Sequence, residues 1–154
     1  VQFQIWTNDE DKYERNFTFP RVTNTDYFVI QNLAGYIADI SGKKDLNLKE
    51  EVQRKAGKKF DMKKDNGAKV QTWEVDQKGV EQWQQWKLII VDKNTIIFEN
   101  VFTRKAIEIE GGVDNIDKNG AKLVSWERHN GESQRFQLVY ADGPLKGQLL
   151  DFEK

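Results

Sequence analysis

The sequence predicts an all-β domain made of three similar units, each with about four short strands. Two observations support this prediction. One peptide motif and its surroundings occur twice and recur in part at the chain ends, and runs of β-branched and aromatic residues alternate with turn residues. With strands this short and evenly spaced, a closed barrel or a sandwich is the expected all-β architecture.

Length and composition fit one folded domain. The chain has 154 residues, of which 38% are hydrophobic and 12% aromatic. This aromatic content is typical of a packed core, whereas disordered chains are poor in aromatics. We therefore expect a single domain over residues 1–154. No apolar run approaches the roughly 18 residues that a membrane-spanning helix needs.

The charge balance and the scarcity of reactive side chains exclude several functions. Lys and Arg number 24 against 25 Asp and Glu, and this net charge of −1 argues against nucleic acid as the main partner. The absence of Cys excludes disulfides, thiolate zinc sites and Cys nucleophiles, and a single His, His129, argues against His-based metal sites and triads. A glycoside hydrolase would need two carboxylates at a defined separation, and no such pair stands out. We expect no catalytic residue, no metal and no cofactor.

The clearest repeat links the middle of the chain to its later part. The segment Gly67–Glu74 (GAKVQTWE) recurs at 120–127 as GAKLVSWE. Each copy is followed by a Gln-x-aromatic motif, Gln84-Gln85-Trp86 in the first and Gln134-Arg135-Phe136 in the second. These motifs are expected to be structural, with the aromatic in the core and the Gln bonded to backbone.

The upstream parts repeat as well. Residues 27–32 and 35–42 parallel residues 95–100 and 105–111. The runs 28–30, 86–91 and 96–98 are β-branched or aromatic and are bounded by Asn, Asp and Gly, as strands are. Turn residues follow at 114–115, 118–120, 130–131 and 142–144. Two four-part units are therefore predicted, repeat B over 23–91 and repeat C over 92–140.

A third copy is split between the chain ends. Val1–Trp6 carries the Trp of the third part, Phe17 carries the aromatic of the fourth, and Gly147–Phe152 resembles the second part. The Trp-to-aromatic spacing is ten to thirteen residues in all three copies. Repeat A would thus comprise residues 137–154 plus 1–22, with the two ends meeting. The start at Val1 is expected to reflect a removed leader or excision from a longer chain.

Repeat B contains an insertion at 43–66 that repeat C lacks. Residues 43–69 hold ten Lys or Arg against five acids. Asn47 followed by Glu50 is a capping box, which predicts a short helix through about Ala56 with Gly57 as its stop. The segment is either a solvated charged loop or a basic patch for a membrane surface or an acidic partner.

Three units with a Gly-x-x-Val-Gln-x-Trp strand followed by Gln-x-aromatic resemble the ricin-type β-trefoil lectin family. The segment Tyr36–Gly42 resembles the short Leu-Asp-Val-Gly element of that family. The resemblance covers most of the chain except the 43–66 insertion. It implies a β-trefoil, a pseudo-threefold barrel capped by hairpins, with up to one shallow sugar site per unit.

The resemblance also implies the site residues. The family uses an Asp from the second part with a Gln and an aromatic from the third, which correspond here to Asp39, Gln71 and Trp73. Trp83 stands where the family usually has Asn, so it is expected to add a second stacking wall. The chemistry suits a sugar, because an indole stacks on the apolar face of a pyranose while a carboxylate and an amide bind its hydroxyls.

The other two units are less complete. In repeat C, Trp126 matches the pattern, but Glu108 replaces the Asp, Val124 the Gln and Ser133 the Asn. In the split repeat, the corresponding trio is Asp151, Gln4 and Trp6. The expected order of binding strength is the Asp39 site, the Asp151 site and then the Glu108 site.

Each of these residues also has a structural interpretation. Trp6, Trp73 and Trp126 could belong to the core, and Asp39 could be an ordinary turn residue closing a hairpin. His129 lies in Arg128-His129-Asn130-Gly131 and is expected to be an exposed turn residue.

The resulting hypothesis is a non-enzymatic, lectin-like domain that binds glycans, with galactose-type sugars favoured by the resemblance. It could be the targeting module of a larger toxin or secreted enzyme, or an oligomer, and a secreted or cell-surface-directed location is favoured over the cytoplasm. The alternative is a trefoil that contacts proteins, as inhibitors and cytokines do, through the basic insertion.

Overall fold

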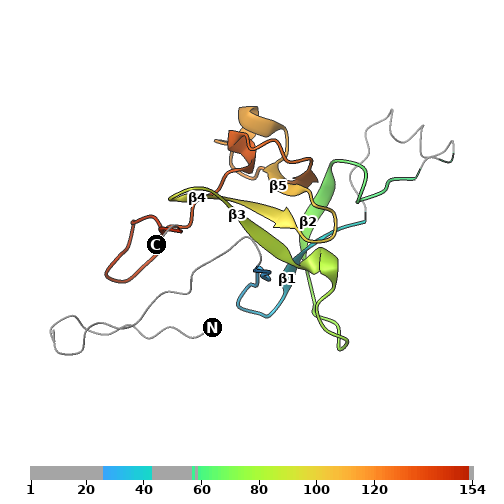
Figure 1. Cartoon of the computed structure of the whole chain (residues 1–154), viewed down its shortest axis with the longest axis horizontal. Coiled ribbons are helices and arrows are strands. Elements are labelled where there is room, and N and C mark those ends of the chain that lie inside the picture. The colour runs from blue at the N-terminus through green and yellow to red at the C-terminus, as the bar shows by residue number, and fades with distance from the viewer. Residues whose placement is uncertain (1–25, 43–56, 58, 153–154) are drawn as a thin grey trace.

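The computed structural model describes residues 26–42, 57 and 59–152 (Figure 1). They form the strands β1 (Ile37–Ile40), β2 (Ala68–Trp73), β3 (Trp86–Asp92), β4 (Thr95–Asn100), β5 (Ala106–Ile109) and β6 (Leu123–Trp126). Three short 3-10 helices complete the described elements: η2 (Gln82–Gln84), η3 (Gly112–Asn115) and η4 (Glu132–Gln134). The all-β prediction is confirmed. No helix of the described part has the length and apolarity needed to cross a membrane.

The six strands form one antiparallel sheet, and the segment before β1 joins its first strand to its last. The order is β1-β2-β6-β5-β4-β3. The segment before β1 pairs with both ends of this order. Phe28 exchanges two 2.8 Å backbone hydrogen bonds with Trp86 of β3, and Ile30 accepts one of 2.8 Å from Ala38 of β1. This closed cycle of pairings covers the edges that an open sheet would expose.

The first hairpin of each predicted repeat has the same geometry. Its two strands pair at Gln31 with Ile37, at Glu99 with Ala106 and at Val139 with Leu149. One residue further toward the turn, a backbone N–H donates across each hairpin: Asn32 to Tyr36, Asn100 to Lys105 and Tyr140 to Gln148. The threefold phase inferred from the sequence is therefore present in the backbone. Residues 1–22 of repeat A and the helix predicted between Asn47 and Ala56 lie outside the described residues.

The core is built around the aromatic of the Gln-x-aromatic motif. Trp86 is fully buried, and its indole N–H donates to the carbonyl of Ala38 at 3.1 Å. It packs with the buried side chains of Ala38, Ile40, Ala68 and Ile107. The equivalent Phe136 is half-buried and lies 5.5 Å from Phe98, measured between ring centroids. The core role expected of these two aromatics is confirmed.

In repeats B and C, the Gln of the same motif holds the loop that follows the third strand. The side chain of Gln84 accepts from the N–H of Glu81 at 3.0 Å and donates to the carbonyl of Glu74 at 3.5 Å. Gln134 accepts from the N–H of His129 at 2.9 Å and donates to the carbonyl of Glu127 at 2.8 Å. A buried amide with a donor and an acceptor can satisfy both kinds of backbone group that a tight loop leaves unpaired.

The end of the basic insertion is attached to the domain. Phe60 and Met62 pack against the core cluster around Trp86. Asn66 accepts hydrogen bonds from Lys105 Nζ at 2.9 Å and from the N–H of Glu127 at 2.8 Å. The charged residues Asp61, Lys63, Lys64 and Asp65 are exposed, as a solvated loop predicts, whereas Phe60, Met62 and Asn66 attach the segment to the domain.

The contrast between two Trp residues of repeat B yields a test of the fold. Trp86→Ala should lower the free energy of unfolding by about 3–5 kcal/mol, because it opens a cavity in the core and leaves the Ala38 carbonyl unpaired. Trp73→Ala should change it by no more than about 0.5 kcal/mol, because the indole is exposed. Urea unfolding followed by circular dichroism measures both. Equal losses would show that Trp73 also supports the core.

Candidate functional site

Strand register brings the three candidate residues of repeat B onto one face. In the β1–β2 pair, Asp39 lies opposite Gln71, and Ile37 lies opposite Trp73. Side chains alternate along a strand, so Gln71 and Trp73 point to the same side as Asp39. The resemblance named these residues, and the hairpin register places them together.

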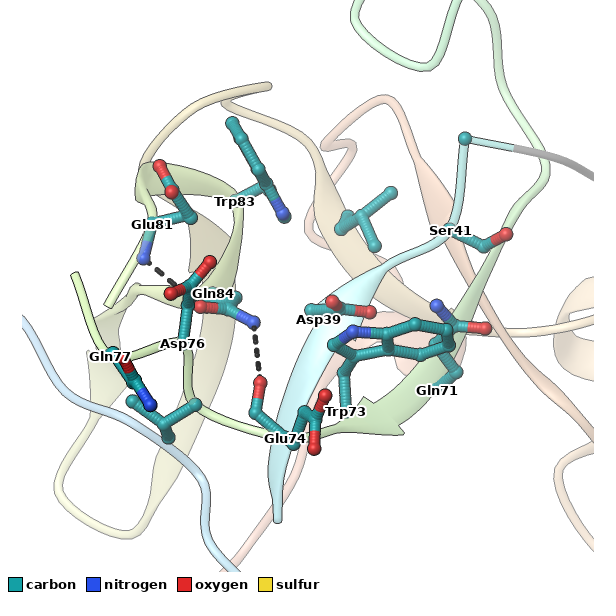
Figure 2. A pocket seen from close by; sticks show the side chains of 13 residues that line it. Asp39, Ser41, Gln71, Trp73, Glu74, Asp76, Gln77, Glu81, Trp83 and Gln84 are labelled. Atoms are coloured by element: carbon teal, nitrogen blue, oxygen red, sulfur yellow. Dashed lines mark hydrogen bonds between the residues drawn. The ribbon is translucent and has the colours of Figure 1, made fainter. Parts of the chain in front are cut away.

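A pocket of about 710 Å³ opens beside them, which we call the B pocket. Its lining comes from β1, from β2, from the turn that follows β2 and from η2. Figure 2 shows Asp39 between Gln84 on one side and Trp73 with Gln71 on the other. Its polar and aromatic lining includes Asp39, Gln71, Trp73, Glu74, Asp76, Glu81, Trp83 and Gln84.

The two Trp residues of the B pocket differ in how they are held. Trp73 is 54% exposed, so the interpretation of this residue as core is wrong, and its ring is available to a ligand. Trp83 is half-buried and makes an edge-to-face contact with Phe102, with ring centroids 5.9 Å apart. Its carbonyl accepts from the Asn100 side chain at 2.9 Å. The pocket therefore has one open aromatic surface and one anchored aromatic wall.

Asp39 is a buried acid with unmet hydrogen-bonding capacity. It belongs to β1 and is 4% exposed, so it is not the turn residue of the alternative interpretation. Burial raises the pKa of its carboxyl, and hydrogen bonds with the side chains of Gln71 and Gln84 offset this only in part. Within the described residues, nothing donates to its Oδ1. A buried acceptor without a donor is unfavourable, so this oxygen favours a ligand that brings a hydroxyl or amine.

Repeat C places its acid in the same way but surrounds it with donors. Glu108 lies opposite Val124 and Ala106 opposite Trp126, which reproduces the register of repeat B. Trp126 is 39% exposed and, with Glu108, lines a pocket of about 550 Å³. Glu108 Oε1 receives three contacts: 2.5 Å from His129 Nε2, 3.1 Å from Gln134 Nε2 and 3.3 Å from Ser133 Oγ. This carboxylate oxygen is already fully occupied by the protein.

His129 is the residue that the sequence did not assign to a site. Its side chain is 46% exposed, as expected of a turn residue, but it is fixed at both ring nitrogens. Nδ1 accepts from the N–H of Gly131 at 3.0 Å, so in the neutral ring Nε2 carries the proton that faces Glu108. The only sequence signal is its place in the loop closed by Gln134, and that does not specify a carboxylate partner.

The split repeat is described on one side only. Leu150 donates to Leu138 at 2.8 Å, as Ala38 does to Ile30, so Asp151 occupies the hairpin position of Asp39. Its carboxylate lies 3.6 Å from Lys93 Nζ. Gln4 and Trp6 lie outside the described residues, so whether they join Asp151 stays a prediction. Nowhere in the described ranges do three or more His, Asp or Glu form a group suited to a metal ion.

Comparisons with known proteins show the fold. No family model and no curated protein matches the chain. A designed threefold-symmetric protein, ThreeFoil, matches with a TM-score of 0.50 and 14% identity over 83% of this chain and 89% of its own. An exo-β-1,3-galactanase from Clostridium thermocellum matches with a TM-score of 0.50 and 20% identity over 80% of this chain and 21% of its own. The β-trefoil fold class is confirmed, and membership of the ricin-type family stays a prediction.

The raised pKa of Asp39 fixes the sign of a pH effect on stability. The folded chain holds this proton better than the unfolded chain, whose carboxyl has the ordinary value of 3.8. The free energy of unfolding should therefore fall as the pH rises from that value through the raised pKa. Asp39→Asn cannot ionise at this position, so the free energy of unfolding of the wild type should fall relative to that of the variant over this pH interval. Above the interval, the difference between the two proteins should stay constant. Urea unfolding of both proteins across the acidic range measures this, and a relative gain for the wild type would contradict the assignment.

Proposed function

We propose that this chain is a non-enzymatic carbohydrate-binding domain whose main sugar site is the B pocket. The observation that carries the proposal is the exposed indole of Trp73 beside the buried, incompletely bonded carboxylate of Asp39. Gln71 completes the arrangement from the same strand pair.

Each of the three groups matches one feature of a pyranose. The indole of Trp73 offers a flat apolar surface to the C–H face of the ring. The carboxylate of Asp39 accepts from ring hydroxyls, and such charge-assisted hydrogen bonds are stronger than neutral ones. Gln71 can both donate to and accept from a neighbouring hydroxyl. Binding would also supply the missing donor to Asp39 Oδ1, so part of the burial penalty is recovered in the complex.

The pocket of repeat C is expected to bind more weakly. Glu108 Oε1 is already engaged by His129, Ser133 and Gln134, so a sugar hydroxyl would have to displace a protein donor. Val124 offers no amide at the Gln71 position. If the Asp151 unit also binds, several weak sites would act together through avidity on a multivalent glycan.

A role beside a larger enzyme or toxin is part of the proposal. The galactanase that shares the fold acts on a galactan by its name, which is consistent with a galactose-type ligand here. This chain spans 21% of that galactanase, so a targeting module in a secreted or cell-surface-directed protein is a reasonable setting. The alternative, protein contact through the basic insertion, depends mostly on residues 43–56 and 58, which lie outside the described part.

A glycan array followed by titration tests the proposal. The wild type should bind immobilised galactose-terminated glycans, and Trp73→Ala should weaken binding by about tenfold or more, because loss of an aromatic platform removes about 1.5 kcal/mol or more of contact. Isothermal titration with the best oligosaccharide gives the affinity of each variant.

Trp126→Ala is the matched control. It removes the equivalent indole from repeat C and should change the affinity of the main site by less than about twofold. Circular dichroism confirms that both variants fold. An array without binding, or equal affinity of the wild type and Trp73→Ala, would reject the proposal.

A further inference from the structure

The B pocket has a one-sided charge. Four of its lining residues are acidic: Asp39, Glu74, Asp76 and Glu81. The rest of the described lining is neutral, with two Trp, three Gln, small residues and aliphatic side chains, and it includes no Lys or Arg. A ligand in this pocket therefore meets carboxylates on several sides, and no Lys or Arg is among the described residues that line it.

Two of these acids are held in place by backbone amides. Asp76 accepts from the N–H of Lys78 at 3.0 Å within its turn. The Glu81 side chain accepts from the backbone N–H of Gln84 in the capping box of η2. Such hydrogen bonds fix the positions of these two carboxylates beside the pocket. The turn after β2 and the start of η2 therefore hold these two acids beside the pocket.

Asp39 is the buried acid of the B pocket. Figure 2 shows Asp39 among the lining side chains, together with Glu74, Asp76 and Glu81. The Oδ1 of Asp39 is buried and lacks a donor within the described residues. This unpartnered oxygen is the independent sign that a donor-bearing ligand belongs here.

The pocket of repeat C carries less negative charge: its described lining has two acids, Glu108 and Glu132, against four in the B pocket. There the acid of the second strand faces His129, Ser133 and Gln134, which supply donors to one of its oxygens. In repeat B, the side chains of Gln71 and Gln84 are the hydrogen-bond partners of Asp39 within the described residues. The two pockets occupy equivalent positions, so their difference in charge arises from their side chains.

We infer that the B pocket selects glycans by charge: it accepts uncharged sugars, favours a sugar bearing an ammonium group, and rejects sugars bearing a carboxylate or sulfate. This inference rests on the proposed sugar-binding function. Partly enclosed carboxylates concentrate a negative potential that attracts cations and repels anions. An ammonium group near Trp73 or Trp83 also gains from the ring face, whereas a carboxylate there does not.

Three matched ligands test the inference. Methyl galactoside, methyl galactosaminide and methyl galacturonide share a ring and differ in one charged group. They are titrated into the wild-type chain at a pH where the amine is protonated and the uronate ionised. The galactosaminide should bind about fivefold more tightly than the galactoside, because one contact between unit charges at about 4 Å in water contributes about 1 kcal/mol. The galacturonide should bind at least about fivefold more weakly than the galactoside. Raising the salt from about 0.05 to 0.5 M should reduce both ratios.

Glu74→Gln and Glu132→Gln form the matched pair of variants. Glu74 is exposed at the B pocket and Glu132 is exposed at the repeat C pocket, so each change removes one charge of the same kind. Glu74→Gln should narrow the galactosaminide-to-galactoside ratio, and Glu132→Gln should leave it unchanged. Circular dichroism confirms folding of both.

The outcomes separate the two proposals. Equal affinity for the three ligands, or tighter binding of the galacturonide, would overturn charge selection and leave sugar binding intact. Equal effects of the two variants would place the selectivity outside the B pocket and overturn the inference. Failure of all three ligands, together with a blank array, would overturn the sugar-binding function and this inference with it.

Discussion

In repeats B and C, the fold and the site both depend on a buried Gln amide. Gln84 and Gln134 close the loop that follows the third strand by bonding backbone groups on both sides of it. Two residues later the chain delivers the core aromatic, Trp86 or Phe136, into pairing with the first strand. The same amide bonds the acid of the second strand. Core, loop and site are thus fixed by one side chain.

Repeats B and C share this backbone arrangement but differ in the side chains around the acid of the second strand. Asp39 and Glu108 occupy equivalent hairpin positions, but the Glu side chain is longer by one methylene and contacts His129 and Ser133. Asp39 is shorter and is left with an oxygen that no described residue serves. At the same backbone position, the acid of repeat B therefore keeps an oxygen for a ligand, whereas the acid of repeat C is engaged by protein side chains.

Much of the fold could be predicted because it depends on local pattern and repetition. The recurring Gly67–Glu74 motif located the third strands, and the Gln-x-aromatic motif located the core aromatic in repeats B and C. The trio Asp39, Gln71 and Trp73 was implied by the resemblance to the ricin-type family, and the β1–β2 register places the three residues on one face. Burial was not predictable in the same way. Trp73 and Trp86 both lie in strands, and only packing makes one exposed and the other buried.

The sequence by itself determined the β class, the threefold phase and the residue types at the site, because these depend on periodicity and on spacing along the chain. Only the tertiary structure decided which groups touch across that spacing. The bond between His129 and Glu108 joins residues 21 positions apart, and the raised pKa of Asp39 depends on the burial of its carboxyl between two strands and η2. Contacts and desolvation are properties of packed segments, and no local pattern specifies them.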